Sequence, residues 1–481
     1  MADFPKNFIW AVATASYQVE GANDEDGRGL SVWDVIRRQP GRIADDSPPT
    51  LSCEHYHHYK EDVQLIKDLK VTHYRLSICW TRILPKGDLS VVNEKGITFY
   101  RSLLEELTKN GISPIVTLFH ADYPYCLYER GGWLNEESLL WFHDFCRLCF
   151  QRFGDLVKYW ITFNELSAHA WWGVTKIEGQ LHHSPDTVEF SMPTRKIPYV
   201  ATHNMLLAHV KVYRMYAREF KEIQQGQLGI TVGGRWCKTF STDIGDIEAV
   251  SRALDWKFNW TVEPIFGNNG DYPESMKSYI KTLEEKEGLE LLPRFTKEQM
   301  NEIKGSADFL GLNYYLTEEI CKGEGRFQME KDARFDYLEG SWEKIAGEQM
   351  WLRYAPEGLL ELLEYIQKKY AVPVLITENG CSDIIGKESE GIEPLNDDHR
   401  IRYIEGHIEA VKKALARGCN VIGYTVWSLM DNFEWHDGFA VRFGLYRVDY
   451  DSPDKKRTIK KSGRYLREFL GRVRNAAAQI E

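Results

Sequence analysis

The feature that most constrains the fold is an alternation of two kinds of segment along the whole chain. Short apolar runs, rich in β-branched and aromatic residues, alternate with longer segments that have helical spacing and Lys/Glu-rich faces. There are eight such runs, at residues 8–13, 74–78, 114–119, 159–162, 228–232, 309–312, 374–377 and 421–426. Their continuous apolar character is typical of strands that are buried on both faces.

The segments between the runs have the apolar spacing of amphipathic helices. The clearest are residues 59–69, 96–110, 137–153, 200–220, 356–370 and 400–417. No Pro/Gly/Ser-rich linker divides the chain, and the repeated strand–helix unit predicts an α/β fold, a single (β/α)8 TIM barrel over residues 1–481. A minimal barrel needs roughly 250 residues, so we expect long loops, with insertions at 178–196, 321–349 and 382–397.

Composition and charge exclude several classes of partner. The 60 Lys and Arg residues against 71 Asp and Glu residues give a net charge of −11, which argues against nucleic acid or an anionic membrane as a partner. No apolar run approaches the roughly 20 residues that span a bilayer, and the start of the chain lacks the pattern of a secretory signal. The nine scattered cysteines suit reduced thiols. We therefore expect a soluble cytoplasmic protein, and the sequence leaves its oligomeric state open.

Histidines gather at two places in the chain. They are His55, His57 and His58 in the first place, and His182 and His183 in the second. Neither place has a His-Glu-x-x-His motif or the paired Cys/His spacing of a metal site. We interpret these histidines as solvated surface residues and expect no metal and no cofactor.

Polar and aromatic residues suited to binding a sugar follow the predicted strands, and one further candidate, Arg75, lies within the second of them. In a barrel of this kind the active site is built where the strands end. The candidates are Gln18, Arg75, His120, Asn164, Glu165, Asn313, Tyr315, Glu378, Asn379, Trp427, Glu434 and Trp435. Amide, imidazole and carboxylate groups can hydrogen-bond ring hydroxyls, and indole rings can stack on the apolar face of a sugar. Glu165 and Glu378 follow strands on different sides of the barrel, where two carboxylates could flank a bond from opposite directions.

Four motifs, in order along the chain, resemble those of glycoside hydrolase family 1. They are residues 8–21 (FIWAVATASYQVEG), 162–165 (TFNE), 376–380 (ITENG) and 427–435 (WSLMDNFEW). Each string alone is weak evidence, whereas four of them at barrel-sized intervals make chance agreement negligible. The resemblance covers essentially the whole chain, and within the family it points to the animal cytosolic β-glucosidases, which are related to the klotho proteins.

The resemblance implies a retaining β-glycosidase that acts on β-glucosides, with β-galactosides or β-fucosides as further substrates. In this interpretation Glu378 attacks the anomeric carbon, and Glu165 protonates the leaving oxygen and then activates water. Arg75 and Tyr315 would contact the nucleophile. The contacts to the sugar hydroxyls would come from Gln18, His120, Asn164, Glu434 and Trp435, with Trp427 as the surface on which the ring stacks.

Three other functions compete with this one. A klotho-like binding protein without activity is disfavoured because both glutamates are present. A thioglucosidase stays open, since plant enzymes of that kind carry glutamine at the acid/base position but an insect type keeps glutamate. A 6-phospho-β-glycosidase is disfavoured because Glu434 would repel the phosphate.

Three positions depart from the family pattern. Leu166 replaces the proline that follows the acid/base glutamate, Ala121 replaces the aromatic residue after the sugar-binding histidine, and Leu352 stands where an aglycone-stacking tryptophan is common. We expect the small Ala121 side chain to enlarge the wall of the pocket. All three changes bear on substrate preference more than on the class of reaction.

Overall fold

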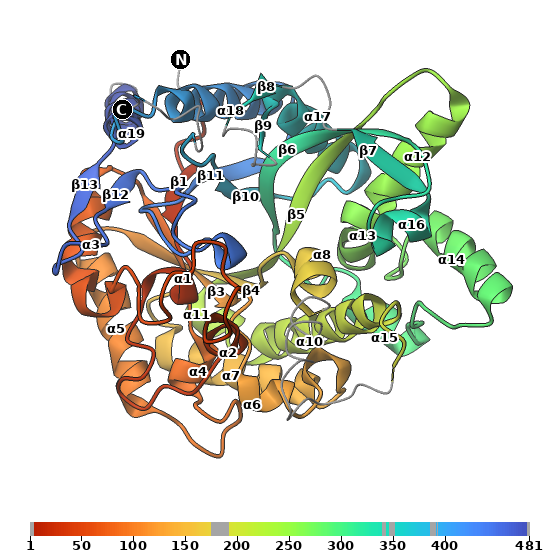
Figure 1. Ribbon diagram of the computed structural model, residues 1–481, viewed down its shortest axis with the longest axis horizontal. Helices are drawn as coiled ribbons and strands as arrows, with labels where there is room; N and C mark the ends of the chain where they lie inside the picture. Colours follow the sequence, from red (N-terminus) through yellow and green to blue (C-terminus); the bar gives the residue numbers. More distant parts are fainter. Residues whose placement is uncertain are drawn as a thin grey trace.

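The central feature of the structure is a closed barrel of parallel strands. The computed structural model describes residues 4–174, 192–338, 343–345, 352–384, 391 and 393–478. The barrel strands (Figure 1) are β1 (Ile9–Ala13), β2 (His73–Ser77), β3 (Ser113–Phe119), β4 (Tyr159–Phe163), β5 (Gln227–Thr239), β6 (Leu310–Lys322), β10 (Val374–Asn379) and β11 (Val421–Trp427). Each strand pairs with the next, and β11 pairs with β1 to close the barrel. The predicted (β/α)8 fold is confirmed.

Long amphipathic helices surround the barrel. The six predicted ones are found as α3 (His55–Asp68), α5 (Glu94–Lys109), α7 (Ser138–Phe153), α10 (Ile197–Glu219), α17 (Pro356–Lys369) and α18 (Asp398–Ala416), and α19 (Lys461–Ala478) ends the chain. In α5, Ile97, Tyr100, Leu104 and Leu107 recur on one face and are buried, and this helix contacts β3. The apolar stripe therefore holds the helix against the barrel, as its period predicts.

The largest departure from the predicted elements is the length of β5 and β6. The apolar runs predict strands that end at residues 232 and 312, but both strands continue past the barrel and stay paired as far as Thr239 and Ile320. A short strand, β7 (Phe335–Leu338), then adds to β6 in the antiparallel direction. Outside the barrel one face of these strands is solvated, so polar residues alternate with apolar ones and no continuous apolar run marks them.

Helical segments between β5 and β6 form a lobe on the right of Figure 1. They are α12 (Ile244–Leu254), η3 (Asp255–Asn259), α13 (Trp260–Phe266), α14 (Glu274–Glu287) and α15 (Lys297–Ile303). The remaining elements are α1 (Ser16–Val19), α2 (Val32–Arg37), α4 (Trp80–Ile83), α6 (Tyr125–Tyr128), η1 (Gly132–Leu134), α8 (Leu166–Ala168), η2 (His169–Val174), α11 (Lys221–Gln224), α16 (Gln328–Ala333), β8 (Glu343–Lys344), β9 (Arg353–Tyr354), η5 (Trp435–Asp437), β12 (Tyr446–Val448) and β13 (Arg457–Ile459).

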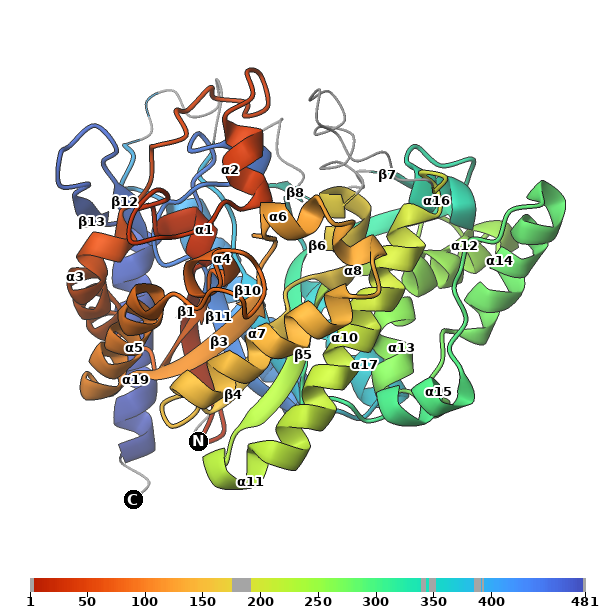
Figure 2. The same ribbon diagram turned by 90° about the horizontal axis from the view of Figure 1, so that it is seen from below.

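The long loops gather at one end of the barrel. Figure 2 shows both chain termini at the opposite end, so β1 runs from that end toward the loops and α1. Of the three expected insertions, 321–349 carries α16, β7 and β8, while most of 178–196 and part of 382–397 lie outside the described residues. Within the described part of the chain, no helix combines the length and the apolar character needed to cross a bilayer.

Candidate active site

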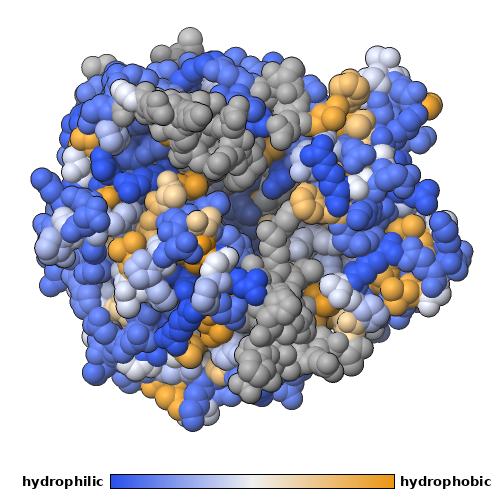
Figure 3. Space-filling view, viewed as in Figure 1, coloured by the Kyte–Doolittle hydropathy of each residue, from blue (hydrophilic) through white to orange (hydrophobic). Residues whose placement is uncertain are grey.

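A pocket of about 540 Å³ opens at the end of the barrel where the strands finish. Figure 3 shows this hollow near the centre of the face that carries the loops. Its wall includes the predicted residues Gln18, His120, Asn164, Glu165, Asn313, Tyr315, Glu378, Trp427, Glu434 and Trp435. Of the other candidates, Arg75 lies beneath the pocket, bonded to Glu378. Asn379 is buried away from it, where it donates to the Tyr314 carbonyl.

Glu378 is held as a carboxylate acceptor from two sides. Arg75 Nη1 donates to Oε1 at 2.7 Å, and the Tyr315 hydroxyl donates to Oε2 at 2.8 Å. The guanidinium of Arg75 is almost fully buried, and its Nη2 also donates to Asn164 Oδ1 at 2.6 Å. These two donors fix both carboxylate oxygens in place, so Glu378 has the surroundings of an oriented nucleophile.

Glu165 has a different environment at the end of β4. Its Oε1 accepts from Asn313 Nδ2 at 2.9 Å, and its backbone lies in the left-handed region with φ 48°. Burial, followed by the charge of Glu378, raises the pKa of Glu165 to about 7. A carboxyl group with that pKa keeps its proton near neutral pH and can donate it, which is the property of a general acid.

Three buried polar atoms at one end of the pocket have no hydrogen-bond partner among the described residues. They are Oε1 of Gln18, Nδ1 of His120 and Oε2 of Glu434. An unsatisfied buried group costs about 1–3 kcal/mol. A ring with several hydroxyl groups would supply the missing partners, so this end of the pocket, which we call the sugar end, is suited to a sugar.

The charge states at the sugar end also suit hydroxyl groups. Burial, with a smaller effect of the Arg75 charge, holds the pKa of His120 well below its usual range, so its imidazole is neutral. Burial, together with Asp437 and Glu378, raises the pKa of Glu434 to about 8. Hydroxyl donors would favour the ionised form of this carboxylate when they bind.

Aromatic rings complete the wall of the sugar end. The ring of His120 lies nearly parallel to those of Trp427 and Trp435, at centroid distances of 6.0 and 6.1 Å. Trp435 in turn packs on Trp33 at 4.8 Å. Trp427 therefore presents an indole beside the polar groups, as stacking on a sugar ring requires.

Comparison with known proteins places the chain among glycoside-cleaving enzymes. The family model described as "Glycosyl hydrolase family 1" matches residues 1–474. This protein belongs to glycosyl hydrolase family 1. A furostanol glycoside 26-O-beta-glucosidase of Hellenia speciosa is 39% identical over 98% of this chain and 83% of its own length. Myrosinase 1 of Brevicoryne brassicae is 38% identical over 97% of this chain and 98% of its own. A rice β-glucosidase crystal structure superposes with a TM-score of 0.87 at 34% identity, covering 97% of this chain and 98% of the rice chain.

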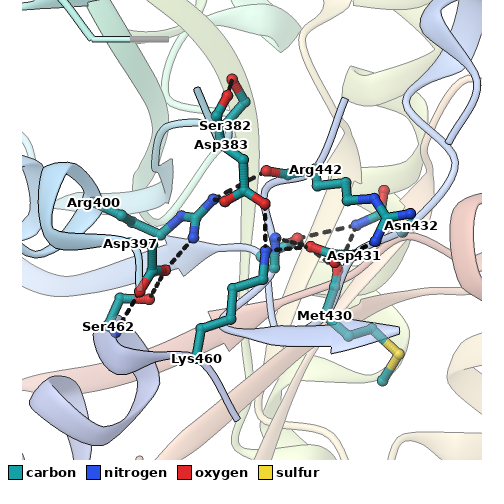
Figure 4. A network of polar contacts seen from close by, with 12 residues as sticks. Ser382, Asp383, Asp397, Arg400, Met430, Asp431, Asn432, Arg442, Lys460 and Ser462 are labelled. Atoms are coloured by element: carbon teal, nitrogen blue, oxygen red, sulfur yellow. Dashed lines mark hydrogen bonds and ion pairs between the residues drawn. The ribbon is translucent and has the colours of Figure 1, made fainter. Parts of the chain in front are cut away.

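A buried network of charges anchors the loop that carries Glu434 in this family 1 enzyme (Figure 4). Lys460 Nζ donates to Asp383 Oδ2 at 2.9 Å and to Asp431 Oδ1 at 2.8 Å, and Lys460 and Asp431 are both fully buried. Arg400 also pairs with Asp383. The network ties the loops after β10 and β11 to the start of α19. The position of Glu434 thus depends on residues from distant parts of the sequence.

The other end of the pocket, which we call the leaving-group end, is formed by residues that the sequence analysis missed. β5 and η3 contribute Arg235 and Lys257 to the wall, Glu318 of β6 pairs with both, and the wall continues over Phe327, Met329 and Tyr337. Glu318 accepts from Arg235 Nη1 at 2.9 Å and from Lys257 Nζ at 2.6 Å. No short motif marks these residues, because they meet only through the extended strands and the lobe between them.

The three departures from the family pattern occupy different environments. Leu166 is fully buried at the first position of α8, where a proline would lose no helical hydrogen bond. Leu352 is also fully buried, in an apolar cluster with Trp427 and Phe443, so it does not offer a stacking surface. Ala121 lies next to His120 with φ 67°, and its carbonyl accepts from Trp33 Nε1 at 3.1 Å. It is not part of the described pocket wall.

The expected surface position of the histidines is wrong for His55. This side chain is buried, and its Nδ1 lies 2.8 Å from Oδ2 of Asp62, which also pairs with Arg457. His57 is exposed, as expected, and His58 is only partly exposed, while His182 and His183 lie outside the described residues. In the described ranges, no three His, Cys, Asp or Glu side chains are grouped closely enough to hold a metal ion.

Proposed function

We propose that this enzyme hydrolyses β-glucosides with retention of configuration, through a covalent glycosyl-enzyme. In the first step Glu165 donates its proton to the glycosidic oxygen while a carboxylate oxygen of Glu378 bonds to the anomeric carbon and the alcohol leaves. In the second step Glu165 takes a proton from water, whose oxygen attacks the same carbon and releases Glu378. Two inversions at that carbon give the β-sugar as the first product.

The observation that carries this proposal is the contrast between the two carboxylates. Glu378 accepts from a guanidinium and a phenol, whereas Glu165 accepts from a neutral amide and has a pKa raised to about 7 by burial. One group is therefore held in place by a charged donor and a hydroxyl donor, and the other is suited to carry a proton near neutral pH. That division of roles is what double displacement requires.

The proposal also covers the sugars that the enzyme accepts and its type within the family. Glu434 faces the sugar end, which supports glucosides first and galactosides or fucosides as further substrates, since galactose differs from glucose at one hydroxyl position and D-fucose at two. The narrower assignment to the animal cytosolic type, and the cytoplasmic location with it, stays a prediction.

The stereochemistry of the product tests the mechanism. We expect proton NMR of an aryl β-glucoside during hydrolysis to show the β-anomer first, followed by slow mutarotation. Initial release of the α-anomer would contradict double displacement. Absence of hydrolysis for every aryl β-glucoside would contradict the activity itself.

Thioglucoside hydrolysis is a second candidate, favoured by one specific observation. The relative named Myrosinase 1 is as similar to this chain as the β-glucosidases are, at 38% identity. Glu165 gives this chain a proton donor, which an oxygen leaving group needs more than a sulfur one. We expect kcat/KM for an aryl β-glucoside to exceed that for the matching thioglucoside, and the reverse order would favour the second candidate.

A further inference from the structure

The leaving-group end of the pocket carries an exposed positive charge close to Glu165. Arg235 lines the pocket, and 43% of its side chain is exposed. Gly233, two residues earlier on β5, lies against Glu165, since a Cβ at that glycine would be 3.5 Å from the Glu165 carboxyl carbon. Arg235 therefore stands just beyond the group that protonates the leaving oxygen, on the side where the leaving group must lie.

Among the charged residues described in the wall at this end of the pocket, Arg235 has the most exposed side chain. Glu318 is shared between Arg235 and Lys257, and the side chains of Glu318 and Lys257 are only 4% and 5% exposed. Glu330 also lines the pocket, but its Oε2 accepts from the backbone N–H groups of Arg326 and Phe327, and the residue is almost fully buried. The carboxylates of Glu318 and Glu330 are thus buried and bound by other groups of the protein, whereas the side chain of Arg235 is partly exposed.

The sugar end has the opposite character. The carboxyl groups of Glu165, Glu378 and Glu434 line the pocket there, and any of them that is ionised would repel a negatively charged leaving group. An acidic substrate therefore needs a cation beyond these groups if it is to bind productively. Arg235 is placed to supply that cation, in a geometry that can hold two oxygens of one anion at once.

Apolar surface borders the same space. Phe327, Met329 and Tyr337 line the pocket next to the charged residues. Tyr337 is flanked by cations, with Lys257 Nζ 5.1 Å and the Arg326 guanidinium carbon 5.2 Å from the centre of its ring. A leaving group that combines a flat apolar ring with an acidic group would match both features.

We propose that Arg235 is a specificity-determining residue that binds an acidic oxygen group, a carboxylate or a sulfate, on the leaving group of the substrate. The inference rests on the proposed β-glucosidase function and adds to it the chemical class of the aglycone. Arg235 touches the leaving group and takes no part in bond breaking. The contact stabilises the bound substrate and aligns the glycosidic oxygen with Glu165.

The test compares substrates that differ only in charge. The pairs are the ortho-, meta- and para-carboxyphenyl β-glucosides and the corresponding carbamoylphenyl β-glucosides, with sulfophenyl glucosides as a third arm. For each pair the ratio of kcat/KM, acid over amide, is measured for the wild type and for Arg235→Gln, Arg235→Lys and Lys238→Gln. Lys238 is the matched control because it lies on the same strand and pairs with Glu361 of α17, outside the pocket wall.

We expect the wild-type ratio to favour the acid by about fivefold or more for at least one ring position, the size of a partly exposed charge-assisted hydrogen bond. Arg235→Gln should bring that ratio to about one, Arg235→Lys should keep part of the preference, and Lys238→Gln should leave it unchanged. Comparing each ratio with that of the wild type cancels the difference in leaving-group acidity. A preference for the sulfophenyl over the carboxyphenyl glucoside would identify a sulfur oxyanion, of which sulfonate is the probe, as the group recognised, and the opposite order would identify carboxylate.

Two results would overturn the inference. One is a wild-type enzyme that prefers the amide at every ring position, and the other is an Arg235→Gln variant whose ratios equal those of the wild type. An equal loss of preference in Lys238→Gln would also count against it. That result would show that the preference comes from the overall positive charge of this surface and not from a contact with Arg235. Hydrolysis of the neutral carbamoylphenyl glucosides reports separately on the proposed function, so failure of the inference and failure of the β-glucosidase assignment are distinguishable.

Discussion

The two ends of the pocket are built in different ways. At the sugar end Arg75, Asn164 and Asn313 are linked side chain to side chain, at 2.6 Å and 3.1 Å, and the guanidinium is buried. At the leaving-group end Arg235 is bonded to Glu318 but keeps 43% of its side chain exposed. The first arrangement fixes the position of each group before substrate arrives, and the second leaves room for leaving groups of different shape. Reaction class and substrate choice are thus carried by separate parts of one cavity.

The most damaging change at the sugar end should be removal of the nucleophile. We expect Glu378→Ala to abolish turnover of every glycoside, because no other group can form the glycosyl-enzyme. Added azide should attack the anomeric carbon directly and give the α-glycosyl azide, which NMR identifies. Formation of the β-azide by this variant would instead assign the nucleophile to another residue.

Removal of the acid/base should have a large effect that depends on the leaving group. Glu165→Ala should spare the first step for aryl glucosides with acidic phenols, which need little proton donation, and slow the second step, so that an intermediate accumulates. Azide needs no general base and should accelerate this variant while giving the β-glycosyl azide. If azide gave the α-product here, the roles of the two glutamates would have to be exchanged.

Substitution of Glu434 should lower activity less than substitution of either catalytic group, but more than substitution of any residue at the leaving-group end. We expect Glu434→Gln to lower kcat/KM on aryl glucosides by about ten- to a hundredfold, since hydrogen bonds to a charged group contribute about 1.5–3 kcal/mol. Asp454→Asn, an exposed acid outside the pocket wall, is the matched control and should stay near the wild type. Equal activity of Glu434→Gln and wild type would remove Glu434 from the sugar site, as would a wild-type preference for 6-phosphorylated sugars.

The raised pKa of Glu165 predicts a pH dependence with a definite sign. The protonated form is the active acid, and with a pKa of about 7 it is lost as the pH rises above neutrality. We expect kcat/KM for a poor leaving group to fall about tenfold per pH unit above that value. The fall should be shallower for an aryl glucoside with an acidic phenol, which serves as the control. A flat profile up to pH 9 for the poor leaving group would contradict the assignment of Glu165 as the acid.

The difference between the sugar end and the leaving-group end also explains which parts of the molecule could be predicted from the sequence. Barrel strands are buried on both faces, so their apolar runs are visible, and the residues of the sugar end follow those runs directly. The extensions of β5 and β6 were missed because their outer parts alternate polar and apolar residues in solvent. Arg235, Glu318 and Lys257 meet only after these strands and the lobe have folded, and no spacing in the chain records that.

His55 also shows what the sequence could not predict, because a residue expected at the surface is buried. Its sequence context, with two further histidines close by, is that of a solvated helix face. The residue is buried because Asp62 accepts from it and is in turn bound by Arg457, which lies 395 positions further along the chain. Local spacing cannot reveal a partner that tertiary packing alone brings near.

The smallest expected effect is that of Ala121, at the edge of the sugar end. A larger side chain there should narrow the entrance, so Ala121→Trp should reduce kcat/KM on bulky aryl glucosides relative to small ones. Ala121 adjoins His120 but is not part of the described pocket wall, and its φ of 67° belongs to the left-handed region. We therefore expect a change of only a few fold in relative rates, with some loss of thermal stability that Ala121→Gly would not show. Unchanged relative rates on a series of small and bulky glucosides would show that this position does not shape the pocket, and would leave substrate choice to the leaving-group end.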